Sequence, residues 1–213
     1  MKTDELIAAL AADTPAVAPG ALRRRLALAL LAATAAAVAL VLVWLGMRPD
    51  MHFAMRKAAF WIKAGYTLAL AACGFSLTLR MGRPGAGAGP ALGAAPAIFG
   101  ALAVLAAVEL LASPAGLRAD ELMGDSWRAC PFLIMVIATP VFAATIWALR
   151  GMAPTRLRVA GASAGLLAGG VGATVYGLHC QEMSAAFVVT WYSLGVAGCV
   201  AVGALLGPRL LRW

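Results

Sequence analysis

Two cysteines are the side chains in this sequence most suited to chemistry, and both lie at the ends of apolar segments. Cys130 directly precedes Pro131, and Cys180 lies between His179 and Glu182. Two thiols at the same level can form a disulfide in an oxidising compartment, and a strained or exposed disulfide can act as a redox sensor. Cys130, His179, Cys180 and Glu182 could instead bind a soft metal ion. A static disulfide and two unrelated thiols are further alternatives.

The rest of the chain offers no catalytic constellation. Cys73 and Cys199 fall inside apolar runs, where a cysteine usually acts as a small apolar filler. His52 and His179 are the only histidines. The sequence has no phosphate-binding loop, nucleophile elbow, zinc-type cysteine pair or HExxH motif. We therefore predict neither an enzyme nor a resident cofactor.

Six apolar runs, each near the length of a membrane-spanning helix, indicate the fold class. A bilayer core needs about 20 helical residues. The chain is 63% hydrophobic and 12% charged, with a mean hydropathy of +0.89, whereas a soluble domain carries about 25% charged residues. Because backbone polar groups in lipid must be satisfied within the segment, we predict an all-α integral membrane protein. The runs are residues 26–46, 60–79, 91–112, 131–149, 159–178 and 187–206.

The basic residues predict the orientation of these spans. An even number of spans places both termini on one side, and the excess of arginine and lysine there predicts that this side is cytoplasmic. The acidic residues of the odd-numbered loops lie on the other side. Because the cations sit at helix ends, the net charge of +8 does not indicate direct nucleic-acid binding. The cations on the predicted cytoplasmic side are Lys2, Arg23, Arg24, Arg25, Arg80, Arg83, Arg150, Arg156, Arg158, Arg209 and Arg212.

An N-terminal segment, residues 1–25, precedes the transmembrane domain at 26–213. Its first 13 residues predict a short amphipathic helix with two acidic residues in the first turn and three apolar residues on one face. A helix this short needs a surface to fold against. The residues alone favour the membrane surface, and a partner protein is the alternative. The acidic residues are Asp4 and Glu5, and the apolar residues are Leu6, Ile7 and Leu10.

Small and ionisable residues inside the spans predict packing rather than transport. Glycine or cysteine recurs every fourth position in the last two spans, which indicates close helix contact within one chain or, alternatively, a dimer interface. Lys63 and Glu109 lie near the outer ends of their spans, and we expect both to reach the membrane interface. The recurring residues are Gly161, Gly165, Gly169, Gly195, Cys199, Gly203 and Gly207.

Several short motifs along the chain together resemble one family. They are residues 1–10 (MKTDELIAAL), 48–50 (RPD), 60–63 (FWIK), 127–131 (WRACP), 178–180 (LHC) with Phe187 and Trp191-Tyr192, and 207–213 (GPRLLRW). Through these stretches the chain is similar, from end to end, to the NrsF family of bacterial inner-membrane proteins.

The resemblance implies an anti-sigma factor that holds an extracytoplasmic-function sigma factor at the inner membrane and releases it under stress. It also implies that Cys130 and Cys180 take part in the response. The N-terminal helix could then dock its apolar face into a sigma factor, with Asp4 and Glu5 meeting basic residues. A small transporter or channel, and a scaffold that contacts only lipid, are the competing hypotheses.

Overall fold

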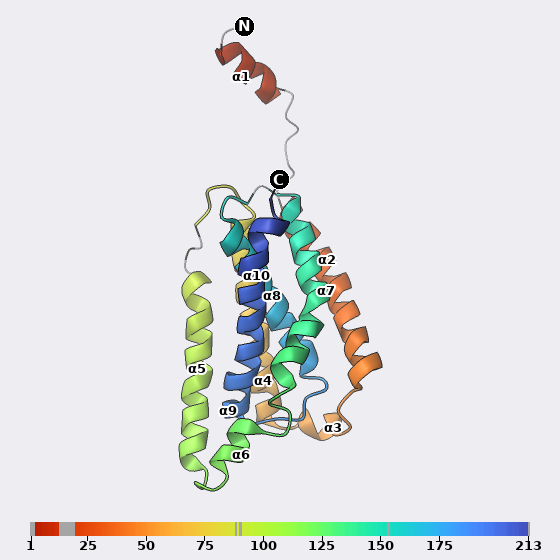
Figure 1. The fold of residues 1–213 in the computed structure, drawn as a ribbon, viewed down its shortest axis with the longest axis vertical. Helices are drawn as coiled ribbons and strands as arrows, with labels where there is room; N and C mark the ends of the chain where they lie inside the picture. The colour runs from red at the N-terminus through yellow and green to blue at the C-terminus, as the bar shows by residue number, and fades with distance from the viewer. Residues whose placement is uncertain (1–2, 13–19, 88, 90, 153, 213) are drawn as a thin grey trace.

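The computed structural model describes residues 3–12, 20–87, 89, 91–152 and 154–212. Within them, six helices are long and apolar enough to cross a bilayer, and they stand side by side in one bundle (Figure 1). This confirms the predicted all-α, six-helix architecture. In chain order the elements are α1 (Thr3–Ala12), α2 (Ala21–Leu40) continuing as the π-helix η1 (Val41–Leu45), α3 (Met51–Ala54), α4 (Ala58–Met81), α5 (Ala91–Ala112), α6 (Arg118–Met123), α7 (Cys130–Arg150), α8 (Leu157–Tyr176), α9 (Ala185–Phe187), the π-helix η2 (Val188–Tyr192) and α10 (Ser193–Leu210).

The two ends of the bundle differ in composition. One end, here called the arginine end, holds the start of α2, the α4–α5 and α7–α8 connections and the C-terminus (Figure 1). The other, here called the cysteine end, holds α3, α6 and the α8–α9 connection at residues 177–184. Cys130 and Cys180 both lie at the cysteine end, as their positions at the ends of apolar runs predict.

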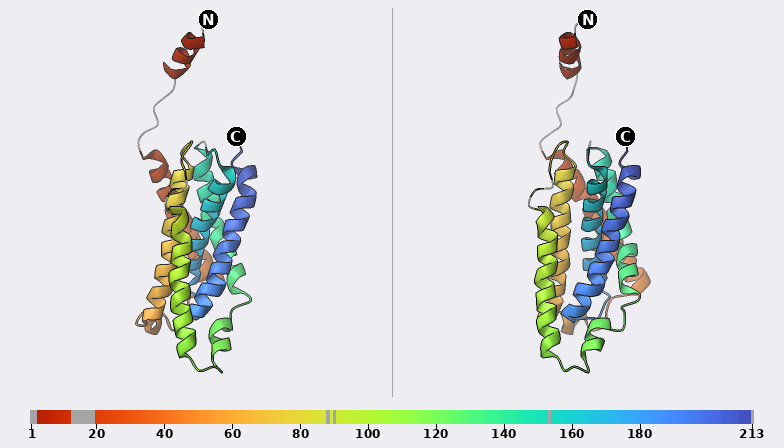
Figure 2. Two further views of the ribbon diagram at one scale, coloured as in Figure 1. Left: turned by 90° about the vertical axis from the view of Figure 1, so that its left-hand side faces the viewer. Right: turned by 60° about the vertical axis from the view of Figure 1, so that its left-hand side comes forward.

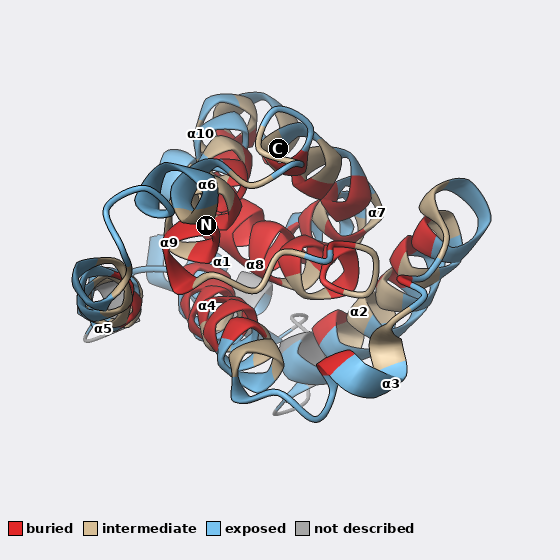
Figure 3. Cartoon of the chain, turned by 90° about the horizontal axis from the view of Figure 1, so that it is seen from below, coloured by how far each residue is buried: buried red, intermediate tan, exposed pale blue. Residues whose placement is uncertain are grey.

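Helix α8 is the central element of the bundle. Over an 18-residue stretch of each span, 78% of the residues are buried in α8 and only 11% in α5. Figure 3 shows α8 surrounded by α4, α7 and α10, with α5 apart at the edge. The side views in Figure 2 likewise show α5 as an outer helix beside α4.

Glycine makes the central position of α8 possible, because it lets neighbouring backbones approach. A methyl group at Gly161 would collide with the carbonyl oxygen of Gly203 on α10. One at Gly170 would lie 2.7 Å from the Cα of Ala71 on α4. The small-residue faces of α8 and α10 therefore pack against each other within one chain, which confirms the first of the two predicted alternatives.

Alanine at Gly172 should lower stability by about 1–3 kcal/mol, as overpacking does in a tight core. The added methyl group would lie 2.9 Å from the Cβ of Ala138 on α7. Gly65 is the matched control, because alanine there meets nothing within 4 Å and should be neutral or stabilising. Thermal unfolding of both variants in detergent measures the difference. Equal melting temperatures would contradict this packing.

Candidate functional site

The two predicted sensing cysteines are buried side chains in one cluster at the cysteine end. Cys130, the first residue of α7, is 0% exposed, and Cys180 is 3% exposed. Both are free thiols, and both belong to the same cluster of buried residues. The Ser126 hydroxyl lies 4.0 Å from the Cys180 sulfur. The structure thus brings together two thiols that are 50 positions apart in the sequence.

Two tyrosines complete this cluster. The rings of Tyr176, at the end of α8, and Tyr192, at the end of η2, have centroids 5.6 Å apart. Tyr192 is fully buried, and its hydroxyl has no hydrogen-bond partner among the described residues. Because η2 is a π-helical turn, it shifts the register of the last span where Tyr192 approaches the thiols. Such turns inside α-helices often mark functional sites.

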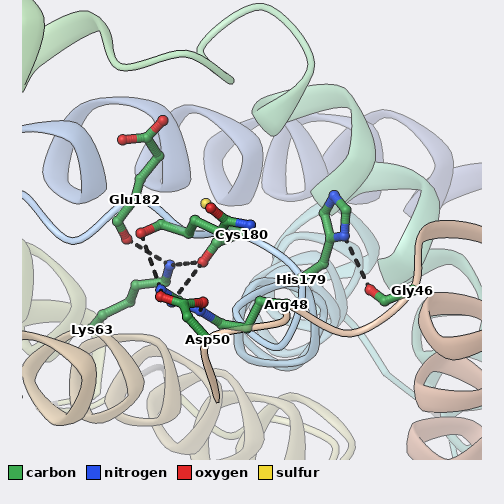
Figure 4. Close-up of polar contacts among 8 residues, drawn as sticks. Gly46, Arg48, Asp50, Lys63, His179, Cys180 and Glu182 are labelled. Atoms are coloured by element: carbon green, nitrogen blue, oxygen red, sulfur yellow. Dashed lines mark hydrogen bonds and ion pairs between the residues drawn. The ribbon is translucent and has the colours of Figure 1, made fainter. Parts of the chain in front are cut away.

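Two buried cations hold the chain at Cys180, an arrangement called here the cation clamp (Figure 4). Arg48 Nη1 donates a hydrogen bond to the carbonyl oxygen of Cys180 at 3.1 Å, and Lys63 Nζ donates to the same oxygen at 3.0 Å. Arg48 Nη2 also donates to Gln181 O at 3.3 Å, and Lys63 to Glu182 O at 2.9 Å. The clamp ties residues 180–182 to α4 and to the α2–α3 connection.

The clamp gives Lys63 partners that the sequence did not predict. That side chain is only 4% exposed, so protein covers it. Its ammonium group instead binds two carbonyl oxygens and lies 4.9 Å from the centre of the Tyr192 ring. Burying a cation is costly unless it is paired and hydrogen-bonded, and these contacts offset that cost. Lys63 is therefore a structural part of the cysteine site.

Asp50 supplies the negative charge of the clamp. Its carboxylate accepts hydrogen bonds from Arg48 Nε at 2.7 Å and from Arg48 Nη2 at 2.8 Å. This two-pronged pairing is the strong geometry of arginine and carboxylate. The hydrogen bond from Arg48 holds the pKa of Asp50 below its ordinary value, and the same bond raises the pKa of Arg48.

The lowered pKa of Asp50 predicts that its contribution to the stability of the fold is constant across the neutral pH range. A carboxylate of this kind stabilises the fold above its unfolded pKa of about 3.9. The contribution is lost as pH falls through the lower folded pKa. Asp50→Asn should therefore lower the melting temperature by a constant amount between about pH 5 and 8, and the difference should shrink only as the pH falls below about 4, toward the lowered pKa of Asp50 in the folded protein. A difference that varies between pH 5 and 8 would contradict the ion pair.

Two carboxylates form further hydrogen bonds in and next to the segment at residues 177–184. Glu182 accepts a hydrogen bond from the backbone N–H of Asp125 at 2.8 Å, and Gly124 has a positive φ of 53° beside that carboxylate. Glu109, on α5, accepts from the N–H of Ala185 at 3.1 Å. Its carboxylate therefore binds the N-terminus of α9, an interaction that the sequence did not predict.

The predicted metal ligands have separate partners. His179 Nδ1 lies 3.1 Å from the carbonyl oxygen of Gly46, while Glu182 binds Asp125. Across the described ranges, no three histidine, cysteine, aspartate or glutamate side chains form a group that could hold a metal ion. Metal binding by Cys130, His179, Cys180 and Glu182 therefore stays a prediction from the sequence.

The predicted partner-binding residues lie on α1, at the arginine end. Asp4 and Glu5 occupy its first turn, and Leu6 and Ile7 are 43% and 59% exposed. The side chain of Leu10 lies outside the described residues. In Figure 1, α1 stands clear of the bundle. Its apolar and acidic side chains are thus displayed together on an accessible helix.

Sequence reasoning missed Arg48 and Lys63 as site residues. A signal was present for Lys63, because an ionisable residue inside an apolar span is by default a candidate functional residue. Apart from Asp50, which pairs with Arg48, the partners of both cations are backbone carbonyls, which have no side-chain pattern that could reveal the pairing. The charge could be noticed, but its contacts could not be read from the sequence.

Comparison with known proteins covers the chain from end to end. A family model described as "Negative regulator of sigma F" (NrsF) matches residues 10–213. A "Probable anti-sigma-F factor NrsF" of Azospira oryzae is 43% identical over 213 residues, with 100% of both chains covered. An "Anti-sigma-F factor NrsF" of Caulobacter vibrioides is 44% identical over 214 residues, also with 100% of both covered. No solved structure matches the chain. The resemblance read from the motifs is confirmed, and this chain belongs to the NrsF family of anti-sigma factors.

Proposed function

We propose that this protein is embedded in the bacterial inner membrane, holds an extracytoplasmic-function sigma factor there and releases it under envelope, redox or metal stress. The arginine end would face the cytoplasm, following the positive-inside rule, and the cysteine end would face the periplasm. Family membership supports the regulatory role, since both named relatives are anti-sigma-F factors. The class of sigma factor, the orientation and the stimulus are our proposals.

Helix α1 is the proposed sigma-binding element, and its exposure is the observation that carries the proposal. Every residue of α1 whose burial is described is exposed. A short helix with exposed Leu6 and Ile7 can lay its apolar face in a groove of a partner. Asp4 and Glu5 would meet basic residues of the sigma factor and steer its approach.

The paired thiols are the proposed stress sensor. An oxidant that accepts two electrons and two protons would join Cys130 to Cys180 through a disulfide bond, and a soft metal ion would instead displace the thiol protons. Either change would move the backbone at Cys180. Since Arg48 and Lys63 bind that backbone, the change would pull directly on the cation clamp.

A route from the clamp toward the cytoplasmic end runs through α4 and α8. Lys63 belongs to α4, and the Thr174 hydroxyl on α8 donates to Thr67 on α4 at 2.8 Å. Further along, Thr78 on α4 donates to Ser163 on α8 at 3.3 Å. Coupling requires an element with two arrangements rather than contacts alone. We propose that α7, which begins at Cys130, shifts against this tied pair.

Deletion of residues 2–13 tests the binding assignment. Full-length protein isolated from its native membrane in mild detergent should bring down a sigma factor, and the truncated protein should lose it. Mass spectrometry identifies the partner. A soluble partner absent from both preparations would instead favour the transporter or scaffold hypotheses.

Two substitutions refine the same experiment. Ile7→Asp puts a charge on the proposed contact face and should reduce sigma recovery at least 10-fold, because burying an unpaired carboxylate is costly. Ala8→Asp adds the same charge about 100° further around the helix and should retain most binding. Equal loss in both variants would show that the apolar face is not the contact.

A further inference from the structure

A continuous apolar groove runs between α5 and α10. One part, of about 540 Å³, lies toward the cysteine end, between α5, α6 and the last span. A second part, of about 340 Å³, continues along α4, α8 and α10 as far as Ala204. The two parts share Phe99, Ser193 and Ala197 in their walls. From Ala186 to Ala204 the groove is about 27 Å long at 1.5 Å per residue, which is close to the thickness of a bilayer core.

The groove exists because α5 does not pack along α10. It contacts its neighbours only at the edges of the groove. Helix α5 makes its main contacts with α4, α9 and η2. Three of the α10 residues in the wall are small: Ala197, Ala201 and Ala204. In Figure 3, α5 lies apart from the other helices. The larger α10 side chains in the wall are Leu194, Val196 and Val200, none of them aromatic.

The polar atoms in the wall are paired, so the groove does not suit a polar permeant. The hydroxyl groups of Tyr66 and Ser193 bond to each other at 2.6 Å. The Thr190 hydroxyl donates to the carbonyl oxygen of Ala186 at 2.9 Å. Hydrocarbon can cover a wall of this kind without leaving a polar group unsatisfied.

The charge at the two ends of the groove differs in sign. At the arginine end, Arg80, Arg158, Arg209 and Arg212 are exposed, and apart from Asp4 and Glu5 on α1, which stands clear of the bundle, the described residues there include no aspartate or glutamate. At the cysteine end, the acidic residues Glu109, Asp120 and Glu121 outnumber Arg118 on α5 and α6. An anionic headgroup would be attracted to the first end and repelled from the second.

We propose that this groove binds an anionic phospholipid of the inner leaflet, with an acyl chain between α5 and α10 and its phosphate against arginines of the arginine end. This inference rests on the membrane orientation proposed above, but not on sigma binding. Volume argues against a helix from a second copy. Such a helix, about 10 Å across, would occupy on the order of 2,000 Å³ over this length, more than twice the volume of the two parts together.

Native mass spectrometry of the full chain tests the proposal, with phosphatidylglycerol and phosphatidylcholine as the probes. The wild-type protein should retain phosphatidylglycerol at least 5-fold more than phosphatidylcholine. Ala103→Trp, on the groove wall, should abolish that retention. Ala101→Trp, two positions away on an exposed face of α5, should leave it unchanged.

Controls separate the site from folding and from self-association. Circular dichroism and thermal unfolding check each variant, and Ala197→Leu, which narrows both parts of the groove, replaces Ala103→Trp if the tryptophan prevents folding. Arg158→Gln with Arg212→Gln should remove the preference for phosphatidylglycerol. Equal retention of both lipids by the wild type would overturn the proposal. Unchanged retention in the groove variants, or a dimer that only the groove variants disrupt, would also overturn it.

Discussion

Lys63→Met should release the segment at residues 177–184 and raise sigma-dependent transcription in unstressed cells. Methionine keeps the apolar stem of the side chain but cannot donate hydrogen bonds to the carbonyl oxygens of Cys180 and Glu182. The Cys180 oxygen keeps its hydrogen bond from Arg48, whereas the Glu182 oxygen loses its donor. An unsatisfied buried acceptor costs about 1–3 kcal/mol. If the structure with free thiols is the sigma-holding state, this cost shifts the balance toward release by about 5- to 150-fold.

Two measurements check the Lys63 prediction independently. A reporter of the sigma regulon gives the change in transcription. Alkylation of Cys180 in isolated membranes, followed by peptide mass spectrometry, gives the opening of the segment around a side chain that is 3% exposed. Reporter transcription and the rate of Cys180 alkylation should rise together. Faster alkylation without a change in transcription would show that the clamp holds the segment but does not carry the signal.

Lys57→Met is the matched control for this substitution. Lys57 lies six residues earlier, just before α4, and its side chain is exposed. Lys57→Met lowers the net charge of the cysteine end by the same amount as Lys63→Met, but it breaks no hydrogen bond to residues 180–182. Wild-type behaviour is expected. A response equal to that of Lys63→Met would assign the effect to net charge and not to the clamp.

The sequence was sufficient to predict the six long apolar helices, because they are recognised by length and hydropathy alone. The run predicted at 131–149 corresponds to α7, and the small-residue spacing correctly predicted the contact between α8 and α10. The last span was predicted to begin at 187, whereas its helix begins at Ala185 and contains η2. Hydropathy does not depend on the register of backbone hydrogen bonds, so it cannot reveal a π-helical turn.

The site was predicted only in part, because its contacts are made between distant segments. The position of Cys130 and Cys180 at the same end of the bundle follows from the boundaries of the apolar runs. The burial of Lys63 depends on how residues 177–184 fold back over α4, and nothing local to Lys63 encodes that. Glu109 is a similar case, since its partner is a backbone N–H 76 positions away. Side-chain patterns could predict neither interaction.

Replacing both Cys130 and Cys180 by serine should abolish induction while leaving sigma retention intact. Serine has a similar volume but forms neither a disulfide nor a strong bond to a soft metal ion. Each single substitution should have the full effect of the double one, because a pair that acts as a unit is not additive. Cells carrying each variant would be challenged with diamide, a thiol oxidant, and separately with Ag⁺ as a soft metal probe.

The pattern of responses distinguishes the two sensing chemistries. A wild-type response to diamide alone favours disulfide formation, and a response to Ag⁺ alone favours metal binding. Replacing Cys73 and Cys199 by alanine is the control, because these buried cysteines lie within α4 and α10 and away from the clamp. That variant should respond normally. Normal induction in the Cys130 and Cys180 double variant would instead show that the stimulus acts elsewhere, and the buried thiols would then be packing residues beneath the clamp.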